Sequence, residues 1–321
     1  MEQIADIKSI FIGTPEFGAI VLDEVVNAGL KPSLVLTSLD KPVGRKQLLT
    51  KPAVKIIAEK HGIPILQAEK MADAKDKIQN INPDVILVAA FGKILPKEIL
   101  EIPKHGALNL HPSLLPRWRG ASPIQHTILS GDTETGATII LMDDKIDHGP
   151  IVAAKKYEGD LSTISYKDLE KELAELGAKL MIETVPKWVS GKIKPEPQEE
   201  DLATYTNVLR KEDGRIIWKN WAKEIERQIR AFSFWPGTYC IWPENDEVKQ
   251  IKILKVCVQA QKDHGPFGVL GKTFMATNEQ IAVQCGKDFL IIEELQMEGK
   301  KPMKVRDFLN GHPDFIGKIL E

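Results

Sequence analysis

The stretch "KSIFIGTPEFGAIVLDEVVNAGLKPSLVLTS", Lys8 to Ser38, decides the fold class of this chain. Its apolar start, 8–14, is typical of a strand that is buried on both faces, and 18–29 has the apolar spacing of an amphipathic helix. A second apolar run, 32–38, is again typical of a buried strand. A strand, a helix and a strand in this order form a parallel βαβ unit, so the stretch predicts an α/β fold.

The same alternation continues to about residue 190. Strand-like apolar runs alternate with segments of helical spacing, and the pattern predicts a doubly wound, mostly parallel, Rossmann-like sheet with helices on both faces. The further expected strands are 63–67, 84–90, 105–111, 135–143 and 149–157, and the further expected helices are 52–62, 71–81, 122–131 and 165–190.

The pattern changes at "GKIKPEPQEED", 191–201, which has the prolines and acidic residues of an exposed linker. Beyond it, short strand-like runs separated by turn residues predict a smaller antiparallel β-barrel of the OB type, with helices at 219–232 and 304–311. We therefore expect an N-terminal domain at 1–190, a linker at 191–208 and a C-terminal domain at 209–321. The strand-like runs are 237–242, 250–260, 267–272, 274–278, 280–286 and 289–296.

The composition is ordinary for a globular protein, with 43% hydrophobic and 27% charged residues among 321. A net charge of −2 does not indicate a nucleic-acid partner, so any such binding has to depend on local basic patches. The three cysteines, Cys240, Cys257 and Cys285, lack CxxC spacing, which predicts a reduced, cytoplasmic protein without a metal site. No apolar run is long enough to span a membrane, and no feature requires an oligomer, so we expect a monomer that does not bind membranes.

The turn "IGTPEFG", 12–18, places Gly13 and Gly18 between a strand and a helix, where glycine-rich loops can bind phosphate groups. The run has neither the GxGxxG spacing of dinucleotide-binding proteins nor the GxxxxGK[ST] spacing of a P-loop. We interpret it as a tight turn that starts the first helix. This argues against a dinucleotide-dependent oxidoreductase, the enzyme class that a doubly wound sheet first suggests.

A basic segment, "LDKPVGRKQLLTKP", follows the second expected strand at 39–52. Lys41, Arg45, Lys46 and Lys51 stand there against a single acidic residue. We expect a long mobile loop, because such a connection is longer than most and contains Gly and Pro. Its charge suits a phosphodiester backbone, but it also suits a solvated surface loop, and the residues alone leave both readings open.

A polar pair lies at the end of the strand expected at 105–111. Asn109 and His111 are two positions apart, so their side chains point to the same face of the strand. Asp147 follows later, in a loop before the next expected strand. Amide and imidazole donors can stabilise an oxyanion, an imidazole can move a proton, and a carboxylate can orient it, which together suit acyl transfer. Spacing alone does not place Asp147 beside His111.

The block "NLHPSLLPRWRGASPIQHTILSGDTETGATIILMDDKIDHGPIV", 109–152, closely resembles the signature of the folate-dependent formyltransferases. The resemblance implies a catalytic set of Asn109, His111 and Asp147, a 10-formyltetrahydrofolate donor and no metal. It also implies that the folate site is bordered by 113–116 and by the loop in "VAAFGKILP", 88–96. The implied folate-site residues are Ser113, Leu114, Leu115, Pro116, Phe91, Gly92, Ile94 and Leu95. We assign no catalytic role to Arg117 or Arg119.

Four further stretches resemble the branch of this family that acts on methionyl-tRNA. They are "FIGTPEFG" (11–18), "LDKPVGRK" (39–46), "IRAFSFWPG" (229–237) and "LQMEGKKPMKVRDFLNG" (295–311). The resemblance implies that the acceptor is the α-amino group of initiator methionyl-tRNA, for translation initiation, and that the C-terminal barrel binds tRNA. It implies that the basic segment enters the acceptor end of the tRNA, with Arg45 as the residue carried over. The charge of the same segment adds Lys41 and Lys46 as expected tRNA contacts.

Two alternatives stay open. A formyltransferase that acts on an amino-sugar nucleotide or another small amine would use the same three catalytic residues without needing the basic segment. A catalytically inactive RNA-binding protein would need the basic residues, but not Asn109, His111 and Asp147.

Overall fold

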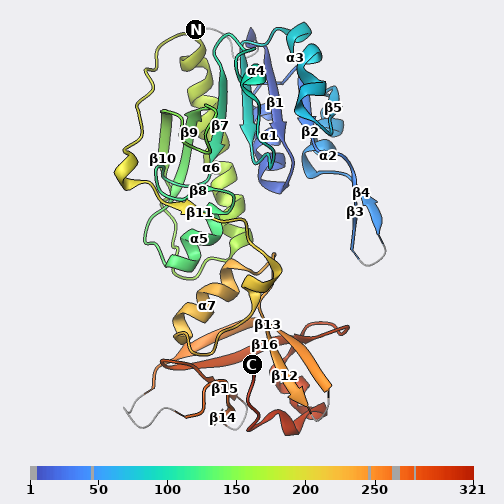
Figure 1. Cartoon of the computed structure of the whole chain (residues 1–321), viewed down its shortest axis with the longest axis vertical. Coiled ribbons are helices and arrows are strands. Elements are labelled where there is room, and N and C mark those ends of the chain that lie inside the picture. Colours follow the sequence, from blue (N-terminus) through green and yellow to red (C-terminus); the bar gives the residue numbers. More distant parts are fainter. Residues whose placement is uncertain (1–5, 45–46, 245–246, 262–267, 278–279) are drawn as a thin grey trace. The chain divides into compact units, whose positions relative to one another are not determined.

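A seven-stranded sheet carries the first part of the chain, in the order β10-β9-β7-β6-β1-β2-β5 (Figure 1). The structure, a computed structural model, describes residues 6–44, 47–244, 247–261, 268–277 and 280–321. The strands are β1 (Ser9–Gly13), β2 (Leu34–Thr37), β5 (Ile65–Gln67), β6 (Val85–Ala89), β7 (Ala107–His111), β9 (Gly136–Leu141) and β10 (Ile151–Lys156).

The sheet is parallel over five strands and antiparallel at one side. The pairs β1–β2, β1–β6, β2–β5 and β6–β7 are parallel, whereas β9 runs antiparallel to both β7 and β10. The residues of β1, β2 and β6 are all buried, as unbroken apolar runs predict for strands covered on both faces. The predicted doubly wound, mostly parallel fold is confirmed. Its helices are α1 (Glu16–Asn27), α2 (Ala53–Lys60), α3 (Lys75–Ile81), α4 (Lys97–Leu100), α5 (Pro123–Ser130) and α6 (Tyr166–Val189).

The turn from β1 into α1 lies against the end of β6. A Cβ atom on Gly13 would come within 2.6 Å of the carbonyl oxygen of Ala89, and one on Gly18 within 2.7 Å, so glycine is needed for this close approach. The chain goes from β1 to β2 on one side, whereas β6 lies on the other side of β1. The carboxyl ends of β1 and β6 therefore form a topological switch point, where open α/β sheets place their ligands.

The basic segment differs from the expected loop. It forms a two-stranded antiparallel hairpin of β3 (Lys41–Val43) and β4 (Leu48–Thr50). The backbone of Gly44 has φ +73° and that of Gln47 has φ +48°, so two left-handed residues turn the chain. Each strand has only three residues, so the alternation of apolar and polar side chains is too short to predict a strand.

The C-terminal part forms an antiparallel sheet in the order β12-β13-β16-β15-β14, with β17 paired to β16. The run 268–272 is not a strand, although its alternation suggested one; it turns, and only Lys272 forms an isolated bridge. The elements are β12 (Tyr239–Glu244), β13 (Glu247–Gln259), β14 (Thr273–Thr277), β15 (Gln280–Gln284), β16 (Phe289–Met297), β17 (Met303–Lys304), α7 (Ala222–Ala231) and α8 (Val305–Gly311).

The last residues of the chain link the two edges of this sheet. Ile241 of β12 and Glu321 exchange two backbone hydrogen bonds of 2.7 and 2.8 Å. On the other edge, Thr273 of β14 donates to the carbonyl oxygen of Lys318 at 2.8 Å and accepts from Gly317 at 2.9 Å. The tail thereby closes the curled sheet, which confirms the predicted barrel.

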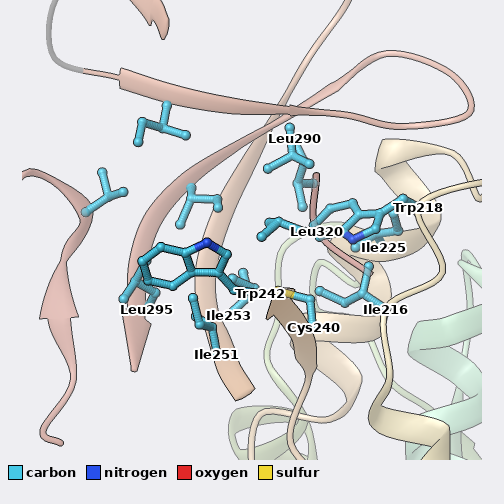
Figure 2. Packing of buried hydrophobic residues seen from close by; sticks show 14 of the residues in the cluster. Ile216, Trp218, Ile225, Cys240, Trp242, Ile251, Ile253, Leu290, Leu295 and Leu320 are labelled. Atoms are coloured by element: carbon cyan, nitrogen blue, oxygen red, sulfur yellow. The ribbon is translucent and has the colours of Figure 1, made fainter. Parts of the chain in front are cut away.

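An apolar cluster fills the barrel (Figure 2). Trp242 is fully buried and makes edge-to-face contacts with Phe308 and Phe315, at ring-centroid distances of 6.0 and 5.2 Å. Leu320, from the closing tail, and Trp218 belong to the same cluster. The tail therefore contributes to the core as well as to the sheet edges.

By contacts the chain divides into two units, which we describe separately. The first comprises 1–124, 133–159 and 168–207, and the second comprises 125–132, 160–167 and 208–321. The expected linker is not an exposed spacer throughout: Glu196 and Ile151 exchange backbone hydrogen bonds of 2.7 and 2.8 Å. Farther on, β11 (Tyr205–Thr206) pairs in parallel with β8 (Arg119–Gly120).

Candidate active site

Strand β7 presents Asn109 and His111 on one face, between β6 and β9. Asn109 pairs in register with Val88 of β6 and Ile140 of β9. Its side chain is half-buried, whereas His111 is only 4% exposed. The alternation of the strand thus brings the amide and the imidazole together, as predicted.

The structure brings Asp147 to this pair. Its Oδ1 accepts a hydrogen bond from Asn109 Nδ2 at 3.2 Å, and its Oδ2 lies 3.5 Å from His111 Nδ1. The backbone N–H of Gly120 donates to the same Oδ2 at 2.8 Å. Both carboxylate oxygens therefore have partners, and the three side chains lie in contact as one group.

The imidazole of His111 has an acceptor on each side. Its Nε2 lies 2.9 Å from the carbonyl oxygen of Trp118, which can only accept, so Nε2 carries a hydrogen. Nδ1 faces the carboxylate of Asp147. Nδ1 is therefore the nitrogen that is left to take up or release a proton, and protonation there completes an ion pair with Asp147.

The turn after His111 is held by internal hydrogen bonds. Ser113 Oγ donates to the carbonyl oxygen of Arg117 at 2.6 Å, and the carbonyl oxygen of Ser113 accepts from Thr138 Oγ1 at 2.7 Å. The N–H of Leu115 donates to the same Thr138 hydroxyl at 3.1 Å, and the peptide bond from Leu115 to Pro116 is cis. Ser113 and Leu115 are buried, whereas Leu114 and Pro116 are partly exposed.

The other stretch expected at the folate site follows β6. Leu95 is buried in the apolar core of the sheet, and Phe91 packs against that core. Gly92 is exposed, and Ile94 is 78% exposed. Phe91 and Leu95 therefore anchor this loop to the core, while Gly92 and Ile94 face solvent.

The residues expected to bind tRNA lie on the hairpin. Lys41 is exposed on β3. Arg45 and Lys46 lie outside the described residues. Lys51, from the same basic segment, already forms an ion pair with Glu59 at 2.9 Å. Hydrogen bonding to Glu59 raises the pKa of Lys51.

A cluster that the sequence did not reveal lies next to Asp147. Arg119 is 1% exposed, and its guanidinium donates to Gln198, Glu200 and Tyr205. Hydrogen bonds from Arg119 lower the pKa of Glu200, and those to Glu200 raise the pKa of Arg119. Arg119 lies within the block 109–152, but no pattern there indicated what its side chain does. Gln198 lies in 191–201, whose composition is that of a linker.

Two negative findings apply to the described part of the chain. Its residues include no group of three or more His, Cys, Asp or Glu side chains that could hold a metal ion. Its helices include none that is long and apolar enough to cross a membrane.

Comparison with known families identifies the class of the protein. Residues 7–185 match the family described as "Formyl transferase", and residues 208–313 match "Formyl transferase, C-terminal domain". The chain belongs to the formyl transferase family.

Relatives of known name match over nearly the full length. The methionyl-tRNA formyltransferase of Citrifermentans bemidjiense is 39% identical over 98% of this chain and 96% of its own. The methionyl-tRNA formyltransferase of Bacillus velezensis is 40% identical over 98% of this chain and 97% of its own.

Solved structures share the fold at lower identity. WlaRD, a sugar 3N-formyl transferase, superposes with a TM-score of 0.63 over 92% of this chain and 99% of its own, at 21% identity. HypX from Aquifex aeolicus, in complex with tetrahydrofolic acid, has a TM-score of 0.65 over 97% of this chain and 48% of its own, at 14% identity. At these identities the likeness shows the fold alone.

Proposed function

We propose that this protein transfers the formyl group of 10-formyltetrahydrofolate to the α-amino group of methionine on initiator methionyl-tRNA, in preparation for translation initiation. The convergence of Asn109, His111 and Asp147 carries the proposal. It is supported by the match to named methionyl-tRNA formyltransferases across both units of the chain. The reaction would take place in the cytoplasm, and a monomer would be sufficient.

The residues present fit a formyl donor. One N–H of the Asn109 amide is used on Asp147, and its second N–H has no partner among the described residues. This donor stands on a strand next to β6, whose carboxyl end lies at the switch point of the sheet. When bound, 10-formyltetrahydrofolate would supply an activated formyl group that an amine can attack.

Asn109 would stabilise the charge that develops on the formyl oxygen. Its position is set by the pairing of β7 with two neighbours and by the bond to Asp147 Oδ1 at 3.2 Å. A donor that is fixed before the reaction costs no reorganisation when charge develops, which is why such donors are effective. The oxyanion is met by side chains, so no metal ion is needed.

His111 and Asp147 would hold and move the proton that the attacking amine releases. Nε2 of His111 stays on the carbonyl oxygen of Trp118, so the proton would pass to Nδ1, next to Asp147 Oδ2. The carboxylate would stabilise the imidazolium that results and would keep the ring oriented. His111 would then pass the proton to the folate nitrogen as the bond from that nitrogen to the formyl carbon breaks, so that tetrahydrofolate leaves as the product. The methionyl ester assists, because it lowers the pKa of the amine and leaves more of it neutral.

The remaining predicted residues would bind the two substrates. The folate would lie against the exposed parts of 91–95 and 113–116, while the buried Leu95, Ser113 and Leu115 would shape the two loops. The hairpin 41–50 would contact the acceptor end of the tRNA through Lys41, Arg45 and Lys46. Domains at 1–190 and 209–321, joined at 191–208, would divide catalysis from tRNA binding.

A sugar formyltransferase is the second candidate, because WlaRD and an N-formyltransferase from Helicobacter canadensis share the fold. The second of these superposes with a TM-score of 0.63 at 19% identity. Such an enzyme would need no basic hairpin. The higher identity of the methionyl-tRNA relatives favours the first candidate.

The deciding experiment offers both acceptors to the purified protein. Charged initiator tRNA and an amino-sugar nucleotide are each incubated with 10-formyltetrahydrofolate, and formylated product is measured. We expect formylation of the methionyl-tRNA and none of the sugar. Formylation of the sugar alone would establish the second candidate, and turnover of neither would remove both.

A further inference from the structure

Hydrogen bonds from Gly120 of β8 and from Gln198 hold Asp147 from two directions. On one side, the N–H of Gly120 donates to the carboxylate Oδ2 at 2.8 Å. On the other side, the side-chain amide of Gln198 donates to the carbonyl oxygens of Asp147 and Gly149, at 2.8 Å each. The amide oxygen of Gln198 in turn accepts from Nε and Nη2 of Arg119, at 3.0 and 2.8 Å. Because Arg119 and Gly120 are consecutive in the chain, these hydrogen bonds form a closed ring of Gly120, Asp147, Gln198 and Arg119.

The far side of the ring is fixed as well. The guanidinium of Arg119 donates to both carboxylate oxygens of Glu200, at 2.9 and 2.7 Å, which is the bidentate geometry in which arginine binds carboxylates most strongly. Its backbone N–H donates to Thr204 at 2.9 Å. Gln198 is 9% exposed, so water competes little for its bonds. The segment that reads as a linker therefore supplies the support of the active-site loop.

The backbone of Asp147 needs such support. Its φ is +47°, in the left-handed region that residues other than glycine rarely adopt. Bonds from Gln198 to the carbonyl oxygens on either side of His148 oppose relaxation of this loop. If the loop relaxed, the carboxylate would leave Asn109 and His111, although no residue of the catalytic set had changed.

We propose that Gln198 and Arg119 are positioning residues that hold the catalytic loop, and with it the carboxylate of Asp147, in the geometry needed for formyl transfer. The inference rests on the proposed function and adds to it two residues that touch neither substrate. They act through Asp147.

Two substitutions of Gln198 test the proposal. Gln198→Glu keeps the length and the oxygen that accepts from Arg119, but it sets carboxylate oxygen against two carbonyl oxygens. Gln198→Ala removes both contacts. We expect each to lower kcat by about 10²-fold, the effect of a misplacement of about 1 Å, with KM for 10-formyltetrahydrofolate and for methionyl-tRNA nearly unchanged. Arg119→Lys, which keeps the charge but loses the two-pronged contact, should lower kcat in the same way.

Gln228 provides a matched control. It stands on α7, and its side-chain amide also donates to two backbone carbonyl oxygens, those of Asp213 and Arg215, at 2.8 and 3.2 Å. Gln228→Ala removes the same kind of bond in the other unit, so kcat should stay at the parent value. Thermal unfolding of all variants shows whether the folded fraction is equal.

Hydrogen exchange and a double-mutant cycle separate positioning from general stability. In the protein without substrates, Gln198→Ala should speed exchange in the peptide that contains 143–149 and leave β6 unchanged. In an Asp147→Asn background, Gln198→Ala should cost little further kcat, because residues that act through one another are not additive. Parent kcat in the folded Gln198 variants, unchanged exchange at 143–149, or full additivity would overturn the proposal. An inactive parent enzyme would instead refute the proposed function, and exchange would still report on positioning.

Discussion

Asn109 and Asp147 are 38 positions apart in the chain, and Asn109 Nδ2 lies 3.2 Å from Asp147 Oδ1. The contact is not a simple consequence of the sheet. Leu141, at the end of β9, pairs with Leu108 near the start of β7, so the loop after β9 leaves the sheet beside the beginning of β7. To meet Asn109 and His111, Asp147 has to turn back over the strand.

The first prediction concerns the amide donor. Asn109→Ala removes the proposed oxyanion donor and should lower kcat by about 10²–10³-fold, while the apolar core around β7 keeps the fold. Steady-state formylation of charged initiator tRNA measures the loss. Asn27→Ala, at the exposed end of α1, is the control and should have no effect. Near-normal turnover in a folded Asn109→Ala protein would remove Asn109 from the catalytic set.

Much of the fold and half of the site follow from the sequence. Unbroken apolar runs predict the buried parallel strands, because burial on both faces leaves no polar positions in β1 or β6 beyond Ser9. A spacing of two predicts that Asn109 and His111 share a face. These inferences depend on local periodicity, which a sequence shows directly.

The remainder depends on contacts between distant segments. The return of Asp147 over β7 needs a left-handed residue and bonds from Gln198, and no local pattern encodes either. The linker-like composition of 191–201 concealed Gln198, because an acidic, proline-containing segment looks the same whether or not one side chain is buried. The hairpin at 41–50 was missed for a similar reason, since its two strands have three residues each.

The second prediction concerns the hairpin and tRNA. Arg45→Ala should weaken productive use of initiator tRNA far more than binding of the folate, and it should reduce the preference for initiator over non-initiator methionyl-tRNA. Formylation efficiency on both tRNAs, measured at two salt concentrations, tests this. A contact with phosphate alone would instead weaken both tRNAs about equally and lower the salt slope by ~1.

Lys51→Ala is the matched control for Arg45. It removes one positive charge from the same basic segment, but this lysine is already paired with Glu59 at 2.9 Å. Its loss should therefore change tRNA use less than the loss of Arg45. If Arg45→Ala leaves both efficiency and preference intact, the hairpin is a solvated connection.

The third prediction concerns the cysteines. Burial raises the pKa of Cys240 and of Cys285 to about 12. Partial desolvation and Glu293 also raise the pKa of Cys257, but its side chain is exposed and accessible to a reagent. A thiol reagent at pH 8 should therefore modify Cys257 in the native protein and all three after denaturation. Cys257→Ser should abolish the native reaction. Rapid native modification of Cys240 or Cys285 would contradict the packing of the barrel core.

The same pKa values set the sign of the alkaline pH dependence of stability. The folded pKa of Cys240 and Cys285 lies above the ordinary thiol value of 9.0, so the neutral thiol is favoured in the folded state. This contribution is fully present below about pH 9 and is lost as the pH rises towards 12. Denaturant midpoints of the parent and of Cys240→Ala, compared between pH 8 and pH 10.5, should fall less for the variant.

The last prediction concerns the closing tail of the barrel. Leu320 is 2% exposed and belongs to the core cluster, and its N–H donates to the carbonyl oxygen of Gly271 at 2.9 Å. Its neighbour Ile319 is 48% exposed. Leu320→Ala should lower the free energy of unfolding by about 2–5 kcal/mol, as for other buried leucines. Ile319→Ala, an exposed substitution of similar size, should change it by no more than about 0.5 kcal/mol.

Urea unfolding followed by tryptophan fluorescence measures both, because Trp218 and Trp242 lie in the same cluster as Leu320. Equal effects of the two substitutions would mean that the tail does not contribute to the core.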